Sequence, residues 1–170
     1  MGLKQSKKRC RILTLGLHGS GITTVLHNLQ LGEVLTLTPT VGFDVEVVEY
    51  DKFSFLSWYI GTPSKMMPLW RHYYPEAVGI IFVIDSNDPK GLVESRSRLK
   101  ELLKSDELAG YPLLVLANKQ DLPQAASVEK VTDILQLRHL DRLWFVQPTC
   151  AIKPFGIQEG LDWLLDHVPK

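Results

Sequence analysis

Apolar residues gather in short runs along the chain, and these runs alternate with stretches of helical periodicity. Most runs are apolar at nearly every position, which is typical of parallel strands covered on both faces. The two runs on either side of Asp51-Lys52 predict an antiparallel hairpin. The six predicted strands are Arg11–Gly16, Val41–Tyr50, Phe53–Ile60, Val78–Asp85, Leu113–Ala117 and Trp144–Gln147.

Helical periodicity follows four of these strands. It is clearest near the end of the chain, where Leu161, Leu164, Leu165 and Val168 fall on one helical face. We therefore predict an α/β protein with a mostly parallel six-stranded sheet and helices on both faces. Ligands of such sheets bind beyond the carboxyl ends of the strands. The predicted helices are Thr23–Leu31, Leu92–Lys104, Val128–Leu135 and Ile157–Val168.

Composition adds a few limits to this picture. A length of 170 residues fits one α/β domain. Zero formal net charge gives no indication of nucleic-acid binding. Cys10 and Cys150 are too few for a disulfide framework and read as small buried residues. We expect no membrane span, since no apolar run reaches about 18 residues. No metal-ligand spacing is present either.

A glycine-rich loop links the first predicted strand to the first predicted helix. Residues Gly16–Thr23 match the phosphate-binding pattern G-x-x-x-x-G-K-[ST], except that Ile22 stands where lysine belongs. In that pattern backbone N–H groups converge on phosphate oxygens, and Thr23 is positioned to bind Mg²⁺. Glycine-rich turns between strands and helices are common, so an ordinary turn fits this segment too.

The segment Asn118-Lys119-Gln120-Asp121 follows a buried strand directly. The two carboxylate oxygens of Asp121 can accept from guanine N1–H and the exocyclic amine, a donor pair that adenine lacks. This N-K-x-D pattern is fairly specific for guanine, although a capped polar loop is the plainer alternative. Thr149–Ala151 follows the last strand, and its backbone could contact the base carbonyl.

Together these segments resemble the ADP-ribosylation-factor-like (Arf-like) family of small GTPases, from Arg11 to the end of the chain. The resemblance implies the P-loop small-GTPase fold, a site for GTP or GDP with Mg²⁺, and effector binding in membrane traffic. It implies a cytoplasmic monomer that visits endomembranes such as the Golgi, with a basic N-terminal segment 1–10 before an Arf-like domain 11–170. The matching segments are LGLHGSGITT, LTPTVGFDVE, MMPLWRHYY, IFVIDSND, NKQDLP and QPTCA.

The resemblance also implies roles for single residues. Thr23 and Thr40 match Mg²⁺ ligands, and Thr40 also matches the threonine that closes on the γ-phosphate. Phe43, Trp58 and Tyr73 match aromatic residues that grip effectors, although ordinary core packing would explain them as well. The implied nucleotide-binding residues are Gly16, Gly19, Ser20, Gly21, Ile22, Thr23, Thr24, Thr40, Thr62, Asn118, Lys119, Asp121, Cys150 and Ala151.

Departures from the family pattern gather at the phosphate end. The family motif W-D-V-G-G-Q appears here as Trp58–Pro63. Tyr59 replaces the aspartate that holds Mg²⁺ through water, and Thr62 replaces a glycine that meets the γ-phosphate. Pro63 replaces the glutamine that orients the attacking water. With Ile22 in place of lysine, these changes imply weakened GTP or GDP binding, impaired hydrolysis and no assignable catalytic residue.

The first residues fit the N-myristoylation pattern M-G-x-x-x-[ST], which makes Gly2 a candidate lipid-attachment site. One myristoyl chain binds membranes only marginally, so the basic residues between Lys4 and Arg11 would supply the second signal. An unmodified tail is the alternative. Three functions stay open: a guanine-nucleotide-binding regulator poor at hydrolysis, a nucleotide-independent interaction module recruited to membranes, and a competent GTPase with a rebuilt site.

Overall fold

The computed structural model describes residues 10–28, 34–37, 45–50, 53–60, 70–153 and 155–169. Within these residues a seven-stranded sheet has the order β2-β3-β4-β1-β5-β6-β7. Its strands are β1 (Cys10–Gly16), β2 (Val34–Leu37), β3 (Val45–Tyr50), β4 (Phe53–Tyr59), β5 (Ala77–Asp85), β6 (Leu113–Asn118) and β7 (Trp144–Pro148).

Strands β4, β1, β5, β6 and β7 run parallel, while β2 and β3 add an antiparallel edge. The α/β class and the mostly parallel sheet are thus confirmed. The predicted count of six strands is wrong, because β2 is an additional strand. It has four residues and pairs antiparallel with β3. So short a run carries little periodicity, and its pairing partner lies further along the chain.

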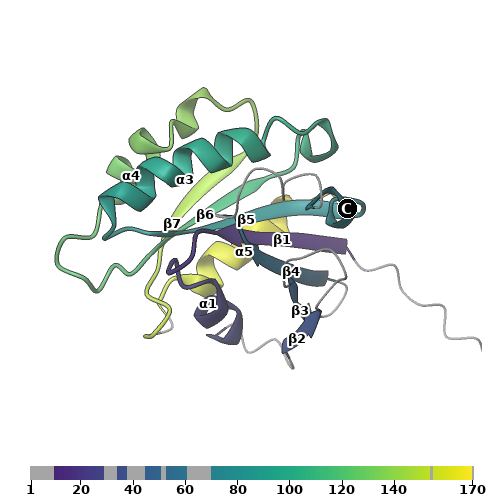
Figure 1. Cartoon of the computed structure of the whole chain (residues 1–170), viewed down its shortest axis with the longest axis horizontal. Helices are drawn as coiled ribbons and strands as arrows, with labels where there is room; N and C mark the ends of the chain where they lie inside the picture. Colours follow the sequence, from purple (N-terminus) through teal and green to yellow (C-terminus); the bar gives the residue numbers. More distant parts are fainter. Residues whose placement is uncertain are drawn as a thin grey trace, which may run out of the picture.

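Helices cover both faces of the sheet (Figure 1), with α3 and α4 on one side and α1 and α5 on the other. The helix α3 begins earlier than predicted, at Pro89 instead of Leu92. Proline suits the first turn of a helix, where its missing N–H would have no partner. The helices are α1 (Ile22–Asn28), α3 (Pro89–Leu102), α4 (Val128–Ile134) and α5 (Ile157–His167).

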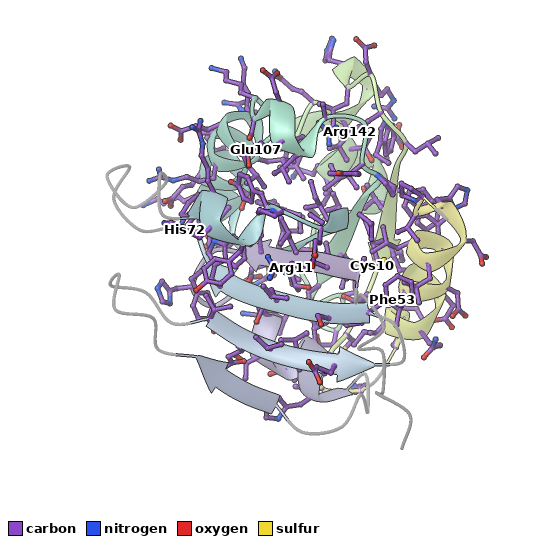
Figure 2. The ribbon with its side chains drawn as sticks, turned by 90° about the vertical axis from the view of Figure 1, so that its right-hand side faces the viewer. Cys10, Arg11, Phe53, His72, Glu107 and Arg142 are labelled. Carbon is purple, nitrogen blue, oxygen red and sulfur yellow. The ribbon has the colours of Figure 1, made fainter. Side chains whose placement is uncertain are left out.

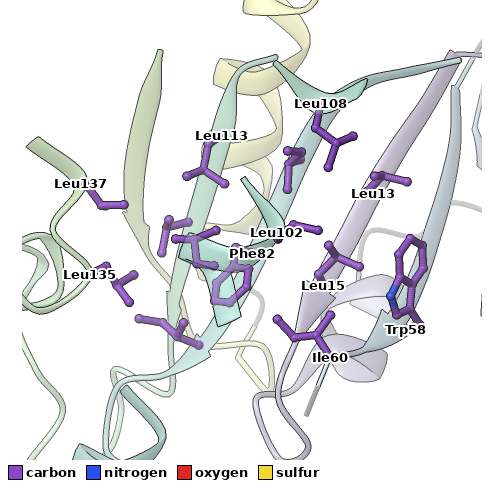
Figure 3. Close-up of a cluster of buried hydrophobic side chains, with 14 of the residues drawn as sticks. Leu13, Leu15, Trp58, Ile60, Phe82, Leu102, Leu108, Leu113, Leu135 and Leu137 are labelled. Atoms are coloured by element: carbon purple, nitrogen blue, oxygen red, sulfur yellow. The ribbon is translucent and has the colours of Figure 1, made fainter. Parts of the chain in front are cut away.

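Alternation along the central strands divides the interior into two apolar clusters. In β1, Leu13 and Leu15 belong to the cluster beneath α3 and α4, whereas Ile12 belongs to the one beneath α1 and α5. Figure 3 shows Leu13 and Leu15 in the first cluster with Phe82 of β5 and Leu102 of α3. The sheet is therefore buried on both faces, as the continuous apolar runs predict.

The predicted apolar face of the last helix is confirmed, since Leu161 and Leu164 are buried in the second cluster and Leu165 packs against it. At the amino end of the sheet, Cys10 of β1 is the register partner of Phe53 of β4. Both residues are labelled in Figure 2. β1 and β4 stay in register from this pair to Gly16 and Tyr59, at the end of the sheet where the site lies.

Candidate functional site

The carboxyl ends of five parallel strands meet at one edge of the sheet. Gly16, the last residue of β1, is the register partner of Tyr59 in β4 and of Val83 in β5. Next along the sheet, Asp85 of β5 is the partner of Asn118 in β6. The predicted glycine loop and the predicted N-K-x-D segment therefore lie at the same edge, where open α/β sheets bind ligands.

The glycine loop, residues 16–21, turns tightly between β1 and α1. Gly21 has φ +98°, and a Cβ there would lie 2.4 Å from Nδ2 of Asn118. A Cβ on Gly16 would lie 2.4 Å from the carbonyl oxygen of Val83. Both positions need glycine because the loop is packed closely against β5 and β6.

Asn118 joins three segments at this edge. Its Nδ2 donates to the carbonyl of Ser20 in the glycine loop at 3.0 Å. Its Oδ1 accepts from Thr149 Oγ1 at 3.0 Å and from the Ala151 N–H at 3.1 Å. The side chain is 2 % exposed, so these bonds form away from water. Asn118 thus fixes the glycine loop and the loop after β7 to the end of β6.

Lys119 and Asp121 lie on the outer side of the same turn. Lys119 has φ +65°, and its Nζ pairs with Oδ2 of Asp85 at 2.9 Å. Asp121 is exposed, and its carboxylate makes no hydrogen bond or ion pair to any residue that the structure describes. The one group suited to guanine recognition is therefore available to a ligand.

Gln120 makes further hydrogen bonds that hold this turn in place. Nε2 of Gln120 lies 3.1 Å from Ser86 Oγ and 3.1 Å from the carbonyl of Ala126, and the Gln120 N–H donates to Thr149 O at 3.1 Å. The turn that carries Asp121 is therefore held in place by the protein itself. Sequence reasoning assigned no role to Gln120, the variable position of the motif.

A pocket of about 170 Å³ lies between these loops. Two of its lining residues, Leu122 and Ile152, were absent from the sequence prediction. Ile152 is 72 % exposed, which gives the pocket an apolar rim suited to the face of a ring. Cys150 is buried outside the lining, and its N–H donates to Phe155 O. The lining residues are Gly21, Thr24, Asn118, Lys119, Asp121, Leu122, Ala151 and Ile152.

The phosphate end of the glycine loop is apolar. Ile22 is 2 % exposed and belongs to the cluster beneath α1 and α5. Its Cδ1 lies 3.2 Å from the point where a Cβ on Gly16 would stand, so the side chain lies against the start of the loop. Where the phosphate-loop pattern places an ammonium group, this chain has a buried hydrocarbon.

Thr23, the predicted Mg²⁺ ligand, is already engaged. Its Oγ1 lies 3.2 Å from the phenolic oxygen of Tyr59, within hydrogen-bond distance. The Tyr59 ring stacks on the His18 ring, with centroids 4.2 Å apart and planes 18° apart. No group of three or more histidine, cysteine or acidic side chains that could hold a metal ion occurs in the described part of the chain. At the position where the family pattern offers Mg²⁺ a carboxylate, the described residues offer the phenol of Tyr59.

Several predicted residues fall outside the described ranges. These are Gly2, Thr40, Phe43, Thr62 and Pro63.

The other two predicted effector residues, Trp58 and Tyr73, have rings 5.6 Å apart. Trp58 is 2 % exposed within the first apolar cluster, which favours core packing for this residue. Tyr73 is partly buried and packs against the same cluster.

One comparison with known proteins bears on these observations. A sequence model of the ADP-ribosylation factor family matches residues 1–168 of the chain. Proteins of this family are GTP-binding regulators of membrane traffic that bind GTP or GDP with Mg²⁺, engage effectors and associate reversibly with membranes. None of the helices described in the structure is long and apolar enough to cross a membrane.

Proposed function

The chain belongs to the ADP-ribosylation factor family, and from this premise we propose that it is a guanine-nucleotide-binding regulator with weakened phosphate binding and impaired hydrolysis. The observation that carries the proposal is the Asn118-centred set of hydrogen bonds, which holds a pocket open beside an exposed carboxylate on Asp121. A guanine base fits this pocket, because its N1–H and exocyclic amine match the two acceptors of Asp121.

Weakened binding follows from what the phosphate end lacks. Removal of one partner from a buried charge pair typically costs about 2–5 kcal/mol. That cost corresponds to roughly 30- to 5,000-fold in affinity. Ile22 supplies no charge for a phosphate, and its side chain is buried in the apolar cluster beneath α1 and α5. We infer that guanine nucleotides bind in the micromolar range or more weakly.

Impaired hydrolysis rests on three replacements that act on one transition state. Hydrolysis needs an oriented water, a held metal and a stabilised γ-phosphate. Pro63 has neither a side-chain amide nor a backbone N–H with which to orient water. Tyr59 has no carboxylate for the water bound to a metal, and Ile22 cannot neutralise charge. We propose that turnover of GTP is negligible.

We propose that membrane attachment uses a myristoyl chain on Gly2 together with the basic residues from Lys4 to Arg11. Neither signal suffices separately, because a single myristoyl chain binds marginally and each cation adds about 1 kcal/mol on anionic lipid. The Gly2→Ala variant should move from the membrane fraction to the cytosol, whereas Gly32→Ala, which leaves the pattern intact, should not. Equal membrane association of both variants would remove the lipid anchor from the proposal.

A second candidate is a nucleotide-independent interaction module. The contact between Thr23 and Tyr59 favours it, since a phenol stands where the family pattern has the carboxylate that holds the metal through water. Such a protein would bind effectors through its switch surface whatever the nucleotide present. The two candidates differ in whether the pocket binds guanine at all.

Selectivity for guanine over adenine decides between these two candidate functions. Protein purified without added nucleotide should be titrated with GDP and with ADP, using the unaltered chain, Asp121→Ala and the control Asp141→Ala. Asp141 is also exposed but precedes β7 at the opposite end of the sheet. We expect GDP to bind better than ADP in the unaltered chain and the control, and the preference to disappear in Asp121→Ala. No binding of either nucleotide would favour the interaction module.

A further inference from the structure

The contact between Tyr59 and Thr23 joins two motifs that lie far apart in the sequence. Tyr59 is the last residue of β4, and Thr23 lies in the first turn of α1. Register fixes the position of Tyr59, because its backbone pairs with Gly16 at the start of the glycine loop. From there its hydroxyl reaches Oγ1 of Thr23 at 3.2 Å. The phenol therefore lies between the two motifs that would hold a metal ion in the phosphate-loop pattern.

Besides this hydrogen bond, the side chain of Tyr59 makes two further contacts. One face stacks on His18, which belongs to the glycine loop itself. The residue is partly buried and packs against the apolar cluster beneath α1 and α5. Movement of the ring out of the site would break the stack, the hydrogen bond and this packing together. In the ligand-free protein the side chain of Tyr59 therefore links the end of β4 to the glycine loop and to α1.

Chemistry argues against a metal at this point. Mg²⁺ requires near-octahedral oxygen ligands at about 2.0–2.1 Å, and it gives up water reluctantly unless carboxylates or phosphates repay the cost. A neutral phenol supplies no such charge. Asp85, the last residue of β5, is already paired with Lys119. The Thr23 hydroxyl can keep its bond to Tyr59 and still offer a lone pair, so the missing negative charge, and not this bond, disfavours the metal.

We propose that Tyr59 takes the structural place of the metal ion at Thr23, so that the pocket binds guanine nucleosides and nucleotides without Mg²⁺. This inference rests on the proposed function, because it assumes that the base pocket is used. Recognition then comes from the base end, where Asp121 and the apolar rim at Ile152 meet the ring. The ligand class is a metal-free guanine nucleoside or nucleotide.

The test compares GDP and guanosine binding in excess Mg²⁺ and in excess EDTA, by calorimetric titration of the full chain. Guanosine has no phosphate to share with a metal, so it reports on the base pocket irrespective of Mg²⁺. We expect the GDP affinity of the unaltered chain to agree within about twofold between the two conditions, far below one decade of affinity. A GDP affinity that is higher in Mg²⁺ by more than about twofold would overturn the inference.

Variants of Tyr59 make the comparison sharper. Tyr59→Asp supplies the missing carboxylate, and we expect GDP, but not guanosine, to bind several-fold more tightly in Mg²⁺ than in EDTA. Tyr59→Phe keeps the ring and its stack on His18, and GDP should still show no response to Mg²⁺. Tyr111→Phe, at the amino end of β6, is the matched control for loss of a hydroxyl. A Mg²⁺ response in Tyr59→Phe equal to that of Tyr59→Asp would contradict the role given to the missing carboxylate.

Failure of this inference is distinguishable from failure of the proposed function. If guanosine binds and Mg²⁺ tightens GDP in the unaltered chain, the pocket is used and the metal-free site is wrong. If neither guanosine nor GDP binds in any condition, the proposed function fails and the inference falls with it. The measurements on the unaltered chain decide both questions even if Tyr59→Asp does not fold.

Discussion

The two ends of the pocket are built from different kinds of contact. At the base end, the buried amide of Asn118 makes hydrogen bonds to Ser20 in the glycine loop and to Thr149 and Ala151 in the loop after β7. At the phosphate end, Ile22 is buried among hydrocarbons and the hydroxyl of Tyr59 contacts Thr23. The first end is built on polar contacts, whereas the described residues of the second are mainly apolar and aromatic.

This difference changes what the N-K-x-D segment means. Asn118 and Lys119 both have partners within the protein, so each would be needed for the local fold even without a nucleotide. Asp121 has no such partner among the described residues and is exposed to solvent. Asn118 and Lys119 therefore build the pocket, and Asp121 supplies the contact to the ligand. Asp121 is the residue whose substitution separates ligand binding from folding.

The largest expected effect comes from rebuilding the phosphate end. A variant that combines Ile22→Lys, Tyr59→Asp, Thr62→Gly and Pro63→Gln restores the lysine, the carboxylate and the water-orienting amide of the family pattern. We expect its GTP hydrolysis in single-turnover phosphate release to exceed that of the unaltered chain by about 100-fold or more, the range lost with one electrostatic contact to a transition state.

Pro63→Gln by itself is the control for this variant. Groups that act on one transition state are not additive, so this single restoration should change the rate little. Hydrolysis by the unaltered chain at the rate of an ordinary GTPase with its activating protein would show that another group has taken over the chemistry. The contrast between the two ends would then not extend to function.

The next effect concerns the base end. Asn118→Ala leaves the Ser20 carbonyl, the Thr149 hydroxyl and the Ala151 N–H without their partner. Each buried polar group left unpaired costs about 1–3 kcal/mol, and partial relaxation makes about 3 kcal/mol in total the expected loss in the free energy of unfolding. Asp121→Ala should lose guanine selectivity with almost no change in unfolding. Urea denaturation of both variants measures the difference, and equal stability would show that Asn118 is not a structural centre.

The fold could be read from the sequence more fully than the site. Apolar runs and their spacing predict the central strands, because burial on both faces demands them. The sequence did not predict β2, because four residues are too few to show a pattern and its place is fixed by pairing with β3. The exposed rim at Ile152 carries no local signal either. It becomes visible once the loop after β7 is joined to Asn118.

The same limit applies to the phosphate end. The sequence shows that Tyr59 and Ile22 are not the residues of the family pattern, and so predicts what is lost. It does not show what replaces the loss, since the contact of Tyr59 with Thr23 spans two motifs and depends on strand register. The stack of His18 on Tyr59 arises in the same way. Nothing in the sequence of the glycine loop indicates this contact, and the partner of His18 is found only in the folded structure.

The smallest expected effect tests whether the phosphate end still has space for charge. In Ile22→Lys, the ammonium group must leave the apolar cluster along the side of the glycine loop, which long side chains achieve by burying their stems. The lysine side chain packs less well than Ile22 in this cluster, so the free energy of unfolding of the ligand-free protein should fall by about 1 kcal/mol. GDP should then bind about tenfold more tightly than to the unaltered chain.

Ile22→Met separates packing from charge, because it has a similar unbranched stem and no ammonium group. Thermal unfolding of both variants with and without GDP measures the effect. A ligand that binds only the folded state stabilises the protein, and this stabilisation grows with the ratio of the ligand concentration to its dissociation constant. We expect GDP to stabilise Ile22→Lys more than Ile22→Met. Equal responses would mean that the lysine stays buried or points away from the ligand. The phosphate end would then be closed by the packing of the whole loop, and restoring one charge would not reopen it.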